Sequence, residues 1–297
     1  MASTAQHYDR AGLTDGLATQ AVRGSMPLYL MLVKSVPAVE YVAWRILFTL
    51  PLCAAFIAWR RAGAEVRAVL RDRRAVLTLL ASASLVAVNW FLYVWAINNG
   101  HVYAASLGYY VLPLLMMLLG LVVLGEKLSP LQWAAVALAA AGVAAGAAGA
   151  LTTLWISFSL ALTFGLYGLL RKTVNAGSLA GLTVESLILA PLALATVWWF
   201  GGSAMTHGPL VAAAVAFGGP MTAVPLIMFA FAARRLPYTV MGFLQFTSPT
   251  IVFLLGLLVF HESLNRAQLA CFVTIWFAAA LFVWDIARRS GCRPLPA

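Results

Sequence analysis

Apolar residues run along the chain in long continuous stretches, which short polar or glycine- and proline-containing turns separate. A stretch of about 20 apolar residues is long enough to cross the hydrocarbon core of a bilayer as an α-helix. Because these stretches do not alternate with polar positions, they predict helices and not the strands of a barrel. The pattern predicts ten spans, at 13–34, 38–59, 75–97, 102–124, 131–149, 151–170, 179–200, 210–233, 238–260 and 267–286.

Composition supports this interpretation. Of the 297 residues, 63% are hydrophobic and 9% are charged, and the mean hydropathy is +0.93. A soluble domain carries far more charge on its surface. The chain is therefore predicted to be an all-α integral membrane protein that has the lipid bilayer as a partner. The net charge of +10 does not indicate a nucleic acid partner, because the basic residues lie in short loops between apolar stretches.

One segment occurs twice. The pattern P-x4-L-L-G-L-x-V-x2-E-x-L-x3-Q covers 113–132 and returns without a gap 136 residues later, at 249–268. An ungapped internal repeat indicates two related halves. We expect a tail at 1–12, a first repeat at 13–150, a second at 151–286 and a basic tail at 287–297.

The number of helices in each repeat predicts that the two halves cross the membrane in opposite orientations. Five is odd, so the second copy crosses the membrane inverted relative to the first. Inverted repeats are typical of secondary transporters, in which a central site opens first to one side and then to the other.

Lysine and arginine residues predict the orientation. Positively charged loops stay in the cytoplasm. With both termini in the cytoplasm, fifteen of the nineteen basic residues fall on the cytoplasmic side, six of them in a predicted loop at 60–74. The first span, 13–34, is the least apolar because it contains Asp15, Arg23, Ser25 and Pro27. We retain it because an odd number of spans would place the N-terminus outside.

Several motifs resemble a known family. They are NWFLYVWAINNGH at 89–101, ASLGYY at 105–110, GLYGLLRK at 165–172, GLTVE at 181–185, RRLP at 234–237 and GFLQF at 242–246. As a set, they resemble the RarD-like branch of the drug/metabolite transporter superfamily, whose repeat is the EamA domain. The resemblance implies ten helices in two inverted EamA units, and export or exchange of small molecules. The chain departs from that branch at 23–26, where Arg-Gly-Ser-Met replaces the usual tryptophan-containing sequence.

Two charges lie inside predicted spans at related places. Arg45 is six residues before Pro51, and Glu185 is six residues before Pro191. A lone charge at bilayer depth is costly, so such groups pair with each other or face a cavity. Arg45 and Glu185 are therefore candidates for a coupling site or for a buried ion pair between the halves, and Glu185 is the candidate proton carrier.

A further set of residues combines polar tips with aromatic rings, which suits a pocket for amphipathic organic molecules. The alternative is hydrogen bonding and packing between helices. The candidates for substrate binding are Asn89, Trp90, Tyr93, Ser106, Tyr109, Tyr110 and Gln245. Helix breaks are predicted near them, since paired interruptions mark transporter sites. They are expected at Gly108, Pro113, Pro225, Gly242 and Pro249.

The function predicted from the sequence is secondary active transport of small organic molecules, with export as the expected direction and proton coupling open. The alternatives are a flippase for a lipid-linked intermediate and a structural or assembly protein. No Walker A or His-Glu-x2-His motif occurs, so we expect no enzyme activity, no cofactor and no metal. The oligomeric state stays open between a monomer and a homodimer.

Overall fold

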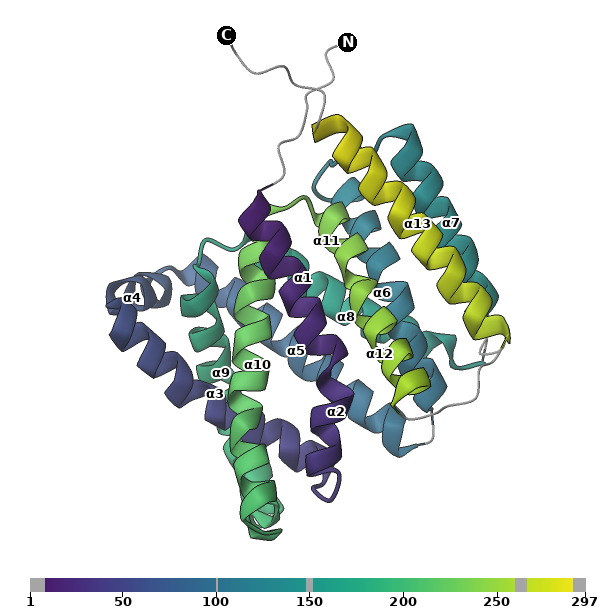
Figure 1. Cartoon of the computed structure of the whole chain (residues 1–297). Helices are drawn as coiled ribbons and strands as arrows, with labels where there is room; N and C mark the ends of the chain where they lie inside the picture. The colour runs from purple at the N-terminus through teal and green to yellow at the C-terminus, as the bar shows by residue number, and fades with distance from the viewer. Residues whose placement is uncertain (1–8, 100, 148–151, 260–265, 291–297) are drawn as a thin grey trace.

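The computed structural model describes residues 9–99, 101–147, 152–259 and 266–290, and these residues are almost entirely helical (Figure 1). The bounds are α1 Arg10–Gly24, α2 Met26–Leu30, η1 Met31–Val33, α3 Ala38–Arg60, α4 Gly63–Arg71, α5 Arg73–Asn98, α6 Val102–Val122, α7 Pro130–Ala147, α8 Leu154–Thr173, α9 Ser178–Trp199, η3 Ser203–Thr206, α10 Pro209–Arg235, α11 Tyr238–Gln245, α12 Thr247–Leu258 and α13 Arg266–Ser290. The all-helical membrane fold predicted from the sequence is confirmed.

Within the described residues, seven segments are long and apolar enough to cross a membrane. They are α3, α5, α6, α8, α9, α10 and the pair α11–α12. The apolar parts of α7 and α13 are shorter, and the first predicted span, 13–34, is not among the seven. The count of ten therefore stays a prediction.

The first predicted span is divided into two helices and a short 3-10 turn. Ser25 separates α1 from α2, and its hydroxyl donates a hydrogen bond to the carbonyl of Val22. Asp9 caps the start of α1 by accepting from the backbone N–H of Ala11 at 2.9 Å. α1 packs along α10 and α12, so the polar first segment is held by neighbouring helices.

The predicted helix breaks need correction. α6 runs without interruption through Gly108 and Pro113, and α10 runs without interruption through Pro225. An interruption does separate α11 from α12 at Phe246, between Gly242 and Pro249. Proline has no N–H to bond the carbonyl four residues earlier, so Pro249 leaves the end of α11 without one of its helical hydrogen bonds.

The basic segment 60–74 contains a helix where a loop was predicted. α4 packs against α5 and α9 and buries Val69, while Arg67 and Arg71 are exposed. One buried apolar stripe among charged residues is typical of an amphipathic helix. The segment was predicted as a loop because its many arginines outweigh the few apolar residues of the stripe.

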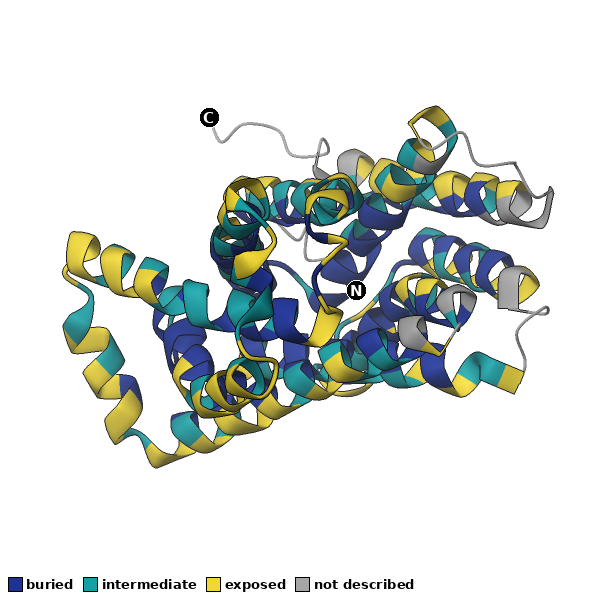
Figure 2. Cartoon of the chain, turned by 90° about the horizontal axis from the view of Figure 1, so that it is seen from below, coloured by how far each residue is buried: buried dark blue, intermediate teal, exposed yellow. Residues whose placement is uncertain are grey.

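Corresponding helices of the two predicted repeats pack against each other. α3 contacts α9, α6 contacts α11, and α7 contacts α13 at one edge of the molecule (Figure 1). Two further contacts are also related by exchange of the repeats, α5 with α8 and α10 with α1. Buried residues gather where these helices meet, and exposed residues cover their outer sides (Figure 2).

Near the upper end of the molecule in Figure 1, helices of the two halves approach closely. Both carboxylate oxygens of Glu126 accept backbone N–H groups at the start of α11, from Tyr238 at 2.5 Å and Thr239 at 2.8 Å. The Tyr238 hydroxyl donates to the carbonyl of Gly165 at 2.5 Å. A side chain at Gly120 would collide with Glu126 and Thr239. We call this region, comprising Gly120, Glu126, Gly168, Tyr238 and Gly242, the packed end.

Candidate functional site

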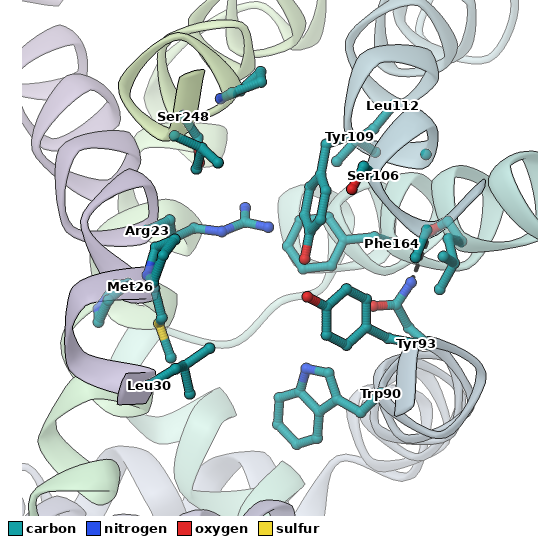
Figure 3. Close-up of a pocket in the computed structure, with 18 of the residues that line it drawn as sticks. Arg23, Met26, Leu30, Trp90, Tyr93, Ser106, Tyr109, Leu112, Phe164 and Ser248 are labelled. Atoms are coloured by element: carbon teal, nitrogen blue, oxygen red, sulfur yellow. Dashed lines mark hydrogen bonds between the residues drawn. The ribbon is translucent and has the colours of Figure 1, made fainter. Parts of the chain in front are cut away.

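A cavity of about 280 Å³ lies between α1–α2, α3, α5, α6, α8, α10 and α12, so both predicted repeats contribute to its wall (Figure 3). This is near the lower limit of ordinary small-molecule sites, which are about 300–1,000 Å³. We call it the central cavity. Its position away from the packed end makes it the candidate functional site.

One wall of the central cavity is aromatic. Tyr93 of α5 and Tyr109 of α6 meet edge to face, with ring centroids 6.1 Å apart. Their hydroxyl groups point into the space that faces Arg23, and Trp90 lies beside Tyr93 (Figure 3). Tyr109 is 39% exposed, so neighbouring side chains leave part of its ring and hydroxyl uncovered in the cavity. Helical spacing explains the arrangement, because residues three or four apart share one face.

Three other predicted binding residues also line the cavity, but two of them have packing roles. Asn89 uses its amide N–H₂ to bond α8, at the carbonyl of Leu160 (2.8 Å) and the hydroxyl of Thr163 (2.9 Å). Tyr110 places its ring 5.6 Å from that of Phe272 on α13. Ser106 is exposed in the cavity.

Three of the predicted break residues, Gly108, Pro225 and Pro249, also lie in the cavity wall. Gly108 has a packing reason: a Cβ there would lie 3.2 Å from Leu160 Cβ and from the Ser157 carbonyl of α8. This supports the packing alternative for Gly108, in place of the predicted break.

Gln245 lies outside the cavity wall and reaches the site through another residue. Its side chain is buried, and its Oε1 accepts a hydrogen bond from Arg23 Nη1 at 3.2 Å. Arg23 itself lines the cavity and was not predicted as a site residue. Its guanidinium lies over the ring of Phe164 at 4.5 Å and projects toward the tyrosines (Figure 3). Its position inside the predicted span 13–34 could have marked Arg23 as a site residue, but we took it only as a charge that makes this span less favourable in the membrane.

Arg45 also lines the cavity. Its Nε donates to the hydroxyl of Thr222 on α10 at 2.7 Å. Its guanidinium lies over the rings of Tyr41 and Trp90, at 5.4 and 5.2 Å. Such cation–π contacts hold an arginine in place without neutralising its charge.

Of the two alternatives for Arg45 and Glu185, the ion pair between them is wrong, and the coupling site stays a prediction. Glu185 is buried, accepts a short hydrogen bond from the Ser82 hydroxyl, and lies 3.8 Å from Nε of Arg171. It lines a very small neighbouring pocket whose wall includes Trp90 and Thr222. Arg171 ends α8 and was assigned to a loop, so the sequence gave no reason to pair it with α9.

The described residues contain no cluster of three or more His, Cys, Asp or Glu side chains that could hold a metal ion. The groups that the central cavity presents are aromatic surfaces, hydroxyl groups and two guanidinium groups.

Comparison with known proteins gives consistent matches over nearly the whole chain. The model of the EamA-like transporter family matches residues 24–145. An uncharacterized transporter of Pseudomonas aeruginosa is 40% identical, over 97% of this chain and 98% of that protein. The protein RarD of Streptomyces exfoliatus is 39% identical over 97% and 94%. A chloramphenicol-sensitive protein RarD of P. aeruginosa is 31% identical over 93% and 95%.

A solved crystal structure of a protein also aligns with this fold. The alignment has a TM-score of 0.76 at 18% identity, and it covers 93% of this chain and 98% of the other. This likeness extends to the fold alone.

Proposed function

This chain belongs to the EamA-like transporter family, and we propose that it is a secondary active transporter that moves small organic molecules through the central cavity. The family assignment confirms the resemblance found in the sequence motifs. Membership of this family makes the chain a membrane transporter. The substrate class, the direction of transport and the energy source are our proposals.

The observation that carries the proposal is the difference between the two ends of the molecule. The central cavity leaves Tyr109 39% exposed, whereas Glu126 and Tyr238 bond backbone groups at the packed end and join the helices there. We propose that a solute reaches the cavity in this state from the end opposite the packed end. Transport requires a second state in which the packed end opens and the cavity end closes.

The packing of corresponding helices supports alternating access. α3 with α9, α6 with α11 and α7 with α13 are the contacts that a two-fold axis in the membrane plane would create. Two halves related in this way can exchange conformations, which exposes the cavity to the other side.

We propose that the packed end faces the cytoplasm and that both termini lie on that side. α1 begins and α13 ends toward the same end of the molecule (Figure 1). Basic residues bond helix ends there: Lys172 donates to the carbonyls of Ala233 (2.8 Å) and Leu236 (2.5 Å). The positive-inside rule places such residues in the cytoplasm. Export across the cytoplasmic membrane is the direction that the family resemblance implies.

A proton-coupled cycle has one candidate carrier beside the cavity. The small pocket that Glu185 lines has Trp90 and Thr222 in common with the central cavity. A movement of these two side chains on solute binding would therefore alter the surroundings of Glu185. Replacing Glu185 with glutamine removes the proton exchange while keeping the shape. Solute-driven proton movement that this variant abolishes, in folded protein, would assign the coupling to Glu185.

The transport proposal is tested by counterflow in proteoliposomes with a panel of labelled organic anions, cations and neutral compounds. We expect accelerated exchange of at least one class over empty liposomes. Ser106→Trp should fill the cavity and abolish the exchange, because Ser106 is exposed inside it.

The matched control is Leu118→Trp on the same helix, where the side chain is 53% exposed and lines no part of the cavity. Exchange should survive that substitution. No exchange of any class by folded wild-type protein, or equal exchange by the Ser106→Trp protein, would contradict transport through this cavity.

A further inference from the structure

We propose that the central cavity binds organic anions that carry an aromatic or similarly apolar body, an inference that rests on the transport function proposed above. It names the class of substrate, which neither the family nor the names of the relatives specify. The supporting observations are the charges in the cavity wall, the partners of those charges, and the character of the remaining wall.

The charge in the wall is positive and uncompensated. Arg23 and Arg45 line the cavity, and no aspartate or glutamate of the described chain lines it. The ion pairs found among the described residues are elsewhere, Arg171 with Glu185 and Arg235 with Asp9. A solute in this cavity therefore meets two guanidinium groups and no carboxylate of the described chain.

Neutral groups hold both guanidinium groups. Arg23 donates to the amide oxygen of Gln245, and Arg45 donates to the Thr222 hydroxyl. Their faces lie over aromatic rings. Each contact uses one N–H or the face of the group, and a guanidinium has five N–H donors, so donors remain for a ligand. The planar fork of arginine matches carboxylate, sulfonate and phosphate oxygens.

The physical cost of the arrangement also favours an anion. Charged side chains at bilayer depth are costly and normally pair with an opposite charge. Arg23 and Arg45 additionally repel each other. A bound anion would supply the missing negative charge, whereas a cation would increase the repulsion and a neutral molecule would leave it unchanged.

The rest of the wall matches an aromatic body and more hydrogen-bond acceptors on the ligand. The Trp90 indole can only donate, and the hydroxyls of Tyr93 and Tyr109 can donate into the cavity (Figure 3). Met26, Leu30 and Phe164 provide apolar surface around them. An anionic group between the arginines and a ring against this wall would use both parts of the cavity.

The test compares three probes of one shape. They are 2-naphthoate, its neutral amide and the cation 2-naphthylmethylamine. Binding to the purified protein is measured by calorimetry, and exchange is measured by counterflow in phosphatidylcholine liposomes. We expect naphthoate to bind at least about tenfold more tightly than the amide, since hydrogen bonds to charged groups exceed neutral ones by that order, and we expect the amine not to bind.

Variants locate the binding. Arg23→Gln and Arg45→Gln should each weaken naphthoate binding about tenfold or more and change amide binding little, whereas Arg45→Lys should fall between. The control is Arg67→Gln, which removes the same charge from the exposed side of α4. It should bind naphthoate as the wild type does. Elution as a single peak and an unchanged unfolding temperature establish that each variant is folded.

The outcomes separate this inference from the transport proposal. Naphthoate binding no tighter than the amide, or unaffected by either arginine substitution, overturns the anion class, even where other solutes exchange through the cavity. Displacement of naphthoate by phosphatidylglycerol at equal affinity assigns the anion to a lipid headgroup and overturns a soluble substrate. Arginine-dependent naphthoate binding without exchange of any solute supports the anion class and contradicts transport.

Discussion

The central cavity and the packed end contain many of the same helices, yet they use polar residues in opposite ways. In the cavity, Arg23 and Tyr109 direct polar atoms into open space (Figure 3), and Arg45 lies in the wall. At the packed end, Glu126 bonds backbone N–H groups of the opposite half, and Tyr238 bonds a backbone carbonyl of α8 in its own half. Polar groups that are bonded to the protein hold two helices together, whereas those that face a cavity are available to a ligand.

Small residues allow the helices at the packed end to approach closely. A Cβ at Gly242 of α11 would lie 2.7 Å from the Pro113 carbonyl of α6, so the two backbones are in contact there. The cavity wall includes large side chains such as Trp90 and Tyr93 beside the small residue Gly108, which lies against α8. Close approach of membrane helices depends on small residues at the interface. Opening the packed end requires separation of these glycine contacts.

The largest expected effect concerns the buried ion pair between α8 and α9. Glu185→Gln leaves Arg171 charged, buried and without a carboxylate partner, and such a loss costs about 3 kcal/mol or more of unfolding free energy. Unfolding in detergent, followed by circular dichroism, measures it. The double change Arg171→Met with Glu185→Leu should recover much of the loss. A Glu185→Gln protein as stable as the wild type would show that the ion pair with Arg171 does not contribute to the unfolding free energy.

The second expected effect concerns the glycine contact of the packed end. Gly242→Ala inserts a methyl group against the α6 backbone, and overpacking of this kind costs about 1–3 kcal/mol. The matched control is Gly63→Ala on α4, where a Cβ meets nothing within 4 Å. That substitution should keep or slightly raise stability, because alanine loses less entropy in a helix than glycine. Equal unfolding temperatures for the two variants would contradict a close contact at Gly242.

The third effect concerns the hydrogen bonds that Glu126 accepts at the start of α11. Glu126→Ala removes a cap that involves two backbone N–H groups, which is worth about 1 kcal/mol, and it should favour the state in which the packed end is open. A cysteine at Thr239, which is 3% exposed, reports the opening through its labelling by a maleimide after Cys53, Cys271 and Cys292 have been replaced.

Labelling at position 239 should be slow in protein that retains Glu126 and several-fold faster in the Glu126→Ala protein. Glu65→Ala on α4 is the control, because this carboxylate lies beside Gly177 and not at the start of α11, and it should not change the rate. Unchanged labelling in the Glu126→Ala protein would mean that other contacts keep this end closed.

The sequence predicted those parts of the fold that depend on local pattern. α3 spans Ala38–Arg60 where 38–59 was expected, and α9 spans Ser178–Trp199 where 179–200 was expected. Helix length in a membrane is fixed by the thickness of the bilayer, so a run of apolar residues is a direct signal. Trp90, Tyr93 and Tyr109 were predicted because aromatic rings with polar tips suit a pocket, and all three lie in the cavity wall, while their role in substrate binding stays a prediction.

Features that depend on the relative position of helices distant in the chain could not be predicted from the sequence. The partner of Glu185 is Arg171 of α8, and the partner of Arg23 is Gln245 of α11. Both depend on how far one helix is shifted along another, which no local pattern specifies. Pro113 and Pro225 were misjudged for a similar reason, since α6 and α10 accommodate them without interruption once neighbouring helices pack around them. The break predicted at Gly242 and Pro249 does occur, between α11 and α12.

The smallest expected effect gives the most direct comparison of the two regions, because it removes one tyrosine hydroxyl from each. Tyr238→Phe loses the hydrogen bond to the Gly165 carbonyl and leaves that acceptor buried, so it should cost about 1 kcal/mol of unfolding free energy. Tyr109→Phe removes a hydroxyl from a side chain that is 39% exposed in the cavity, so stability should stay within about 0.5 kcal/mol. Binding of 2-naphthoate should show the reverse order, weakened a few-fold by Tyr109→Phe and unchanged by Tyr238→Phe. Equal effects of the two variants on both measurements would remove the distinction between a region built for ligand and a region built for closure.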